Sequence, residues 1–83
     1  MIRYRLRERI ADFAFTHGRH LSLKEIAEAT GIHRTTLSRI LNQHGYNATV
    51  DNIDKLCSFF RCRVEDLLEH VPELEKTPQE TNR

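Results

Sequence analysis

The sequence predicts a compact all-α domain of five helices over residues 1–71, followed by a short, flexible polar tail over residues 72–83. Three observations lead to this prediction. Apolar residues recur every three or four positions in five separate segments, which is the period of an amphipathic helix. Glycines and hydroxyl-bearing residues stand at the ends of these segments, where helices need caps. No segment shows the pattern of a strand, and 83 residues leave room for only one small domain.

The first helix is predicted over residues 2–17, and Gly18 supplies the left-handed backbone that commonly ends a helix. The residues at helical spacing within it are Ile2, Leu6, Ile10, Phe13, Ala14 and His17. Arginines at alternate positions form no single stripe on a helix, so we interpret them as a solvated face; they are Arg3, Arg5, Arg7 and Arg9. A second helix begins after Ser22, whose hydroxyl can cap the first amides, and Glu25 completes a capping box.

A sharp turn is predicted between the second and third helices. The second helix runs to Thr30, Gly31 permits the left-handed backbone of a tight turn, and Ile32 places an apolar side chain in the core. The third helix covers residues 33–42, and its inward stripe is Leu37, Ile40 and Leu41. So short a connection forces the two helices to cross sharply, which is the geometry of a helix-turn-helix.

The rest of the chain predicts two more helices and the tail. Thr49 is placed to cap the fourth helix, whose apolar residues are Val50, Ile53, Leu56, Cys57 and Phe60. After a break at residues 61–63, the apolar residues of a short fifth helix are Val64, Leu67, Leu68 and Val71. From Pro72 onward the chain is polar, as in a segment that cannot bury a core.

The net charge of +1 conceals a division along the chain, because residues 1–46 carry a formal charge of +4 and residues 47–83 carry −3. This segregation favours one basic face for a polyanion and an acidic remainder. The N-terminus lacks the apolar stretch of a signal peptide, and no apolar run approaches the roughly 18 residues needed to cross a bilayer. We therefore expect a cytoplasmic protein without a membrane partner.

The outward face of the third helix, opposite Leu37, carries side chains that can hydrogen-bond. They are Arg34, Thr35, Ser38, Arg39 and Asn42. A major groove about 12 Å wide accepts a helix, arginine can donate two hydrogen bonds to guanine, and threonine methyls can contact thymine. The amides at the start of the helix also favour a phosphate. This pattern predicts that the third helix binds duplex DNA.

Residues 22–41, SLKEIAEATGIHRTTLSRIL, and 49–68, TVDNIDKLCSFFRCRVEDLL, resemble the lambda-repressor and Cro-like (Xre family) helix-turn-helix proteins. The resemblance implies a lambda-repressor-like domain that acts as a small transcriptional regulator, sequence-specific for double-stranded DNA and homodimeric. By position it implies base contacts from Arg34, Thr35, Ser38 and Arg39. It also implies phosphate contacts from Ser22, His33, Asn42 and Gln43. The chain departs from the family at Leu23, where glutamine is frequent, and at His33, where serine or threonine is common.

Two alternatives remain open at this level. The chain could be the DNA-binding antitoxin of a toxin–antitoxin pair, with the polar tail folding onto a protein partner. It could also be a protein-interaction module that kept the fold and lost DNA binding, which the near-neutral charge and Leu23 favour.

An enzyme is not expected. Ser38, His33 and Asp12 are residue types that hydrolases use, but nothing in the sequence sets a base against a nucleophile or forms an oxyanion hole. The spacing of Cys57 and Cys62 differs from the tighter pairs of structural zinc sites, and we interpret both as small buried hydrophobes. We therefore expect neither a catalytic residue, nor a metal, nor a cofactor.

Overall fold

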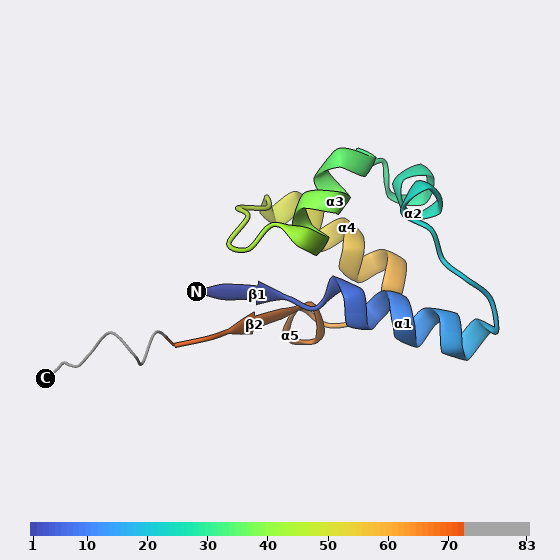
Figure 1. The fold of residues 1–83 in the computed structure, drawn as a ribbon, viewed down its shortest axis with the longest axis horizontal. Helices are drawn as coiled ribbons and strands as arrows, with labels where there is room; N and C mark the ends of the chain where they lie inside the picture. Colours follow the sequence, from blue (N-terminus) through green and yellow to red (C-terminus); the bar gives the residue numbers. More distant parts are fainter. Residues whose placement is uncertain (73–83) are drawn as a thin grey trace, which may run out of the picture.

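The computed structural model describes residues 1–72 and contains the five predicted helices, together with two short strands (Figure 1). In chain order the elements are β1 (Ile2–Tyr4), α1 (Leu6–His17), α2 (Leu23–Thr30), α3 (Arg34–Asn42), α4 (Val50–Phe60), α5 (Val64–Leu67) and β2 (Leu68–His70). The prediction of a five-helix domain is confirmed. The predicted polar tail, and with it the partner-binding role suggested for it, lies outside the described residues from position 73 onward.

The two strands correct the sequence prediction at both ends of the domain. The first helix begins at Leu6 and not at residue 2, because residues 2–4 form β1. The fifth helix ends at Leu67, and the residues after it form β2. The strands pair antiparallel, with Ile2 opposite His70 and Tyr4 opposite Leu68. The expectation that the chain contains no strand was therefore wrong, since a three-residue strand is too short to show a periodic pattern.

Ion pairs across this two-stranded ribbon account for two of the alternating arginines. The carboxylate of Glu69 lies 2.6 Å from Arg3 Nη2 and 3.2 Å from Arg5 Nη2. The hydrogen bond from Arg5, with the charge of Arg3 in addition, holds the pKa of Glu69 below its ordinary value. Arg3 and Arg5 are thus bound to β2 and do not belong to a freely solvated helix face.

The lowered pKa of Glu69 predicts how the stability of the fold depends on pH. Because that pKa is lower in the folded than in the unfolded chain, the ion pairs stabilise the fold above the unfolded-state pKa of about 4.3. This contribution is lost as the pH falls through the folded-state value. Glu69→Gln should therefore unfold at lower urea concentration than the wild type at pH 7, and the difference should narrow progressively below about pH 4.

The control for that comparison is Glu28→Gln, which removes the same charge from a side chain that has no ion pair with any described residue. Its urea midpoint at pH 7 should stay closer to the wild type than that of Glu69→Gln. A constant difference between Glu69→Gln and the wild type from pH 7 to pH 3 would show that the ionised carboxylate does not stabilise the ribbon.

The predicted helix caps are present, with one difference at α2. Gly18 and Gly31 both adopt left-handed backbone, with φ of 65° and 78°. The hydroxyl of Ser22 accepts a hydrogen bond from the Glu25 amide at 3.2 Å. The capping box is incomplete, because the Glu25 carboxylate accepts hydrogen bonds of 2.9 and 2.7 Å from the guanidinium of Arg19 instead. These bonds hold the pKa of Glu25 below its ordinary value.

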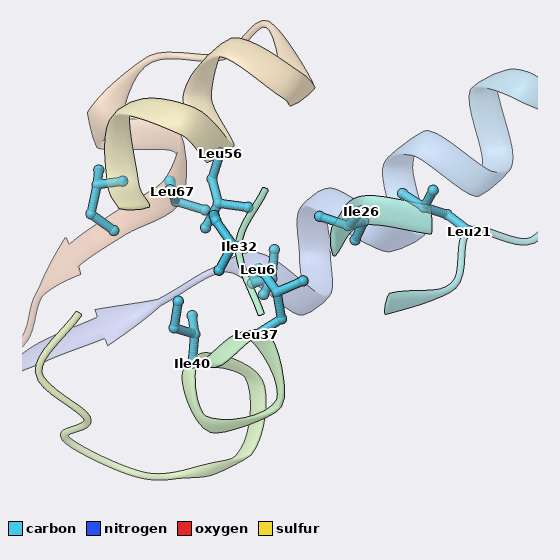
Figure 2. Packing of buried hydrophobic residues seen from close by; sticks show 9 residues of the cluster. Leu6, Leu21, Ile26, Ile32, Leu37, Ile40, Leu56 and Leu67 are labelled. Atoms are coloured by element: carbon cyan, nitrogen blue, oxygen red, sulfur yellow. The ribbon is translucent and has the colours of Figure 1, made fainter. Parts of the chain in front are cut away.

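A single apolar core joins all five helices and the loop before α2 (Figure 2). Its buried residues are Leu6, Leu21, Ile26, Ile32, Leu37, Ile40, Ile53, Leu56 and Leu67. Two residues expected on apolar stripes are exposed instead, since Val50 is 85% and Val64 is 53% exposed. Each is the first residue of its helix.

Candidate nucleic-acid interface

The turn between α2 and α3 is built by backbone geometry and one threonine. Gly31, in its left-handed conformation, donates its amide to the Ala27 carbonyl at 2.8 Å. The hydroxyl of Thr30 donates to the Ile26 carbonyl at 2.7 Å and accepts from the Ile32 amide at 3.2 Å. Ile32 is 5% exposed, so the turn is anchored in the core as predicted. This anchor sets the angle at which α3 leaves α2.

The orientation of α3 follows from its buried side chains. Leu37 and Ile40 are buried and point from α3 into the core (Figure 2). In Figure 1, α2 and α3 stand together at one edge of the domain, with α4 and α1 on their inner side, and α1 also contacts α3. The side of α3 that faces away from the core is therefore open to solvent.

The four residues predicted to contact bases share one patch of this open surface. Arg34, Thr35, Ser38 and Arg39 line the same surface depression, which Leu23 of α2 also borders. The two arginines and Thr35 are exposed, and Ser38 is half-buried. The structure thus places Leu23, the apolar residue at which the chain departs from the family pattern, beside the four side chains predicted to contact bases.

The N-terminal end of α3 lacks a side-chain cap. His33 is the N-cap residue, in extended conformation, and its imidazole makes no capping hydrogen bond. The helices α2 and α4 differ from α3, because each has a side-chain cap. Ser22 caps α2, and in α4 the hydroxyl of Thr49 accepts a hydrogen bond from the Asn52 amide at 3.1 Å. The first-turn amides of α3 therefore keep hydrogen-bonding capacity for an anion.

The C-terminal end of α3 holds the other predicted phosphate contacts. The Arg7 guanidinium donates to Asn42 Oδ1 at 2.9 Å, and Asn42 Nδ2 donates to the Ser38 hydroxyl at 3.4 Å. Gln43 is exposed and ends the helix, with its amide donated to the Arg39 carbonyl at 2.8 Å. The sequence did not predict this place for Arg7, because the alternating arginines of the predicted helix over residues 2–17 were interpreted as a solvated face.

The loop after α3 is held to the N-terminal ribbon by Tyr4. Its hydroxyl donates to the Tyr46 carbonyl at 2.7 Å and accepts from the Ala48 amide at 3.1 Å. Both bonds join β1 to a loop more than 40 residues later in the chain. The sequence contained no signal for this contact, since a tyrosine in a predicted helix indicates no particular partner.

Uncompensated positive charge concentrates around the helix-turn-helix. Most basic side chains in the described part of the chain pair with a carboxylate, as Arg9 does with Asp12 at 3.0 Å. Those without an ion pair to a described residue are Arg7, Lys24, Arg34, Arg39 and Arg61. All but Arg61 lie on α2, on α3 or in contact with α3. These four positive charges, unpaired within the described chain, therefore lie on or beside the helix-turn-helix, where the likewise unpaired carboxylate of Glu28 on α2 also lies.

The two cysteines are free, half-buried thiols near the end of α4. Burial, together with the neighbouring Cys57, raises the pKa of Cys62 to about 11, so its thiol stays protonated at neutral pH. Among residues 1–72, no three histidine, cysteine or acidic side chains cluster in a way that could hold a metal ion. Within the same residues, no helix combines the length and the apolar character of a membrane span.

The fold and the surface of α3 together define a helix-turn-helix DNA-binding protein. The sequence model of the Cro/C1-type helix-turn-helix DNA-binding domain matches residues 15–73, and the chain belongs to that family. This membership confirms the resemblance inferred from the sequence. Neither a curated protein nor a solved structure matches the chain significantly. The matched region begins at residue 15, near the end of α1, so β1 and most of α1 lie outside it.

Proposed function

We propose that this protein binds double-stranded DNA in a sequence-specific manner, with α3 in the major groove, and acts as a small transcriptional regulator. One observation carries the proposal. Arg34, Thr35, Ser38 and Arg39 line one open depression on α3, on the side away from the buried Leu37. Charged and hydroxyl side chains gathered on one helix face, without carboxylate partners, are suited to the edges of base pairs.

The dimensions and chemistry of α3 fit a groove. With its side chains an α-helix is about 10–12 Å in diameter, which the major groove, about 12 Å wide, can accept. Arg34 and Arg39 can each donate two hydrogen bonds to guanine N7 and O6. Leu23 and the methyl group of Thr35 border the same depression and can contact thymine methyl groups.

Phosphate contacts are proposed for Ser22, His33, Asn42 and Gln43. His33 lies at the uncapped start of α3, where free amides and the helix dipole favour an anion. Asn42 and Gln43 lie at the opposite end of the same helix. The Ser22 hydroxyl accepts a hydrogen bond from the backbone amide of Glu25, and its own proton remains to be donated to a phosphate. These contacts would fix the register of α3 without reading the sequence.

We also propose a homodimer on a two-fold-related operator. One recognition helix reads only a few base pairs, and dimers of this motif gain specificity by reading two half-sites about 34 Å apart. The alternative of a fold without DNA binding is disfavoured by the free positive charge on and around α3, because a protein-docking face without DNA has no need of it.

A selection from random duplexes at a stated salt concentration tests the proposal. We expect enrichment of one sequence, with two related half-sites centred about one helical turn apart. Binding should weaken steeply with salt, since phosphate contacts release counterions. If no duplex is enriched and mixed-sequence DNA does not bind at low salt, the proposed function is wrong. Enrichment of a single half-site would contradict the dimer alone.

A further inference from the structure

Arg7 is fixed beside the recognition helix by the residues that precede it. Leu6, immediately before it, is fully buried in the core (Figure 2). Tyr4 is tied to the loop after α3 through the Tyr46 carbonyl. Arg7 itself donates to Asn42 Oδ1 at 2.9 Å, across 35 positions of sequence. The first turn of α1 therefore holds this guanidinium at the C-terminal end of α3.

The charge of Arg7 is unneutralised, unlike that of the arginines around it. Arg3 and Arg5 share the carboxylate of Glu69, and Arg9 pairs with Asp12. Arg7 is exposed, and its one hydrogen bond within the described chain is to a neutral amide. A guanidinium has five N–H donors, so it retains several for a further acceptor.

The surface next to Asn42 also suits an anion. A small recess there is lined by residues of β1 and of the segment from Ile40 to Gly45, with Asn42 among them; no acidic side chain lines it, and Arg7, which donates to the Asn42 amide, lies outside it. The Arg7 guanidinium also determines the orientation of the Asn42 amide. Because Oδ1 accepts from Arg7, the NH₂ group is directed to Ser38, and one of its N–H donors remains for another acceptor.

We propose that Arg7 is a further DNA-contacting residue, which binds a backbone phosphate together with Asn42 and positions the Asn42 amide for that contact. This inference rests on the proposed function. The place of Asn42 supports it: Asn42 is the last residue of α3, and when the first turn of such a helix contacts base edges, its last turn lies closer to the sugar-phosphate backbone. A planar, permanently charged guanidinium is the side chain best suited to two adjacent phosphate oxygens.

The test compares Arg7→Ala and Arg7→Lys with the wild type on sonicated, mixed-sequence duplex DNA, by fluorescence anisotropy over a KCl series. Mixed-sequence DNA is used because a phosphate contact persists on every sequence. We expect Arg7→Ala to weaken binding about tenfold and to make the slope of log K against log salt shallower by about 0.9. Arg7→Lys should restore the wild-type slope, since it keeps the charge.

Arg63→Ala is the matched control. It removes the same charge from an exposed arginine at the start of α5, which Figure 1 shows on the other side of the β1–β2 ribbon from α3. Its salt slope should stay close to that of the wild type. Equal slopes for Arg7→Ala and Arg63→Ala would overturn the inference. So would a lower urea midpoint for Arg7→Ala with an unchanged slope, because that result indicates a purely structural role.

The positioning role has its own measurement. If Arg7 orients Asn42, then Asn42→Ala should weaken binding less in the Arg7→Ala background than in the wild type. Equal effects in the two backgrounds would overturn this part of the inference. The inference and the proposed function fail in different ways. Wild-type protein that binds no duplex contradicts both, whereas wild-type binding that Arg7→Ala leaves unchanged contradicts the inference alone.

Discussion

Replacing Arg34 and Arg39 together by alanine is expected to abolish the preference of this protein for its selected duplex over mixed-sequence DNA. Both side chains are exposed, lack an ion pair within the described chain and line the same depression on α3. A bidentate contact between arginine and guanine contributes about 1–3 kcal/mol of discrimination, so the two together account for about 2–6 kcal/mol if they act independently. Competition binding of selected against mixed-sequence DNA measures this directly.

The control for the loss of two charges is the double variant Lys55→Ala with Arg63→Ala. Both of these side chains make ion pairs, Lys55 with Asp51 at 3.0 Å and Arg63 with Glu65 at 3.4 Å. This control should reduce affinity for all duplexes slightly and keep the preference for the selected sequence. A double variant of Arg34 and Arg39 that retains full discrimination would show that α3 does not read the bases.

Leu37→Ala is expected to lower the free energy of unfolding by about 3 kcal/mol. Leu37 is 0% exposed and, with Ile40, anchors α3 in the core. Buried leucine-to-alanine substitutions cost about 2–5 kcal/mol, because transfer free energy is lost and a cavity remains. Domains are stable by only about 5–15 kcal/mol, and one this small is expected near the lower end. Urea unfolding followed by far-UV circular dichroism measures the change.

Val50→Ala is the matched control for the core substitution. The sequence pattern placed Val50 on the apolar stripe of the fourth helix, but the structure leaves it 85% exposed at the first position of α4. Its removal should change the free energy of unfolding by about 0.5 kcal/mol or less. If Val50→Ala destabilises the domain as much as Leu37→Ala does, the described packing of α4 is wrong.

The parts of the fold that depend on neighbouring residues could be predicted from the sequence. Helix periods, the Ser22 and Thr49 caps and the glycine turn at Gly31 act over a few residues, so their signals lie within one short segment. The residues on the face of α3 opposite Leu37 could be predicted from the same local geometry. For this reason the sequence predicted both the helix-turn-helix and the outward side chains of α3 that we propose as base contacts.

The contacts that join the two ends of the domain could not be predicted in this way. Tyr4 pairs with Leu68 across 64 positions, and a strand of three residues has no periodicity that reveals its partner. Glu69 and the Arg3–Arg5 pair attract each other only after this register has formed. A long-range pairing depends on which segments the core brings close, and no short window of sequence contains that information.

The sequence by itself determined that this chain folds into helices, where the turn before α3 lies and which side chains that helix presents. Those properties arise from backbone preference and apolar spacing, which are local. Only the tertiary structure decided what supports α3 at its C-terminal end. There the buried Leu6 and the ribbon hold Arg7 against Asn42, and packing between distant segments sets that contact.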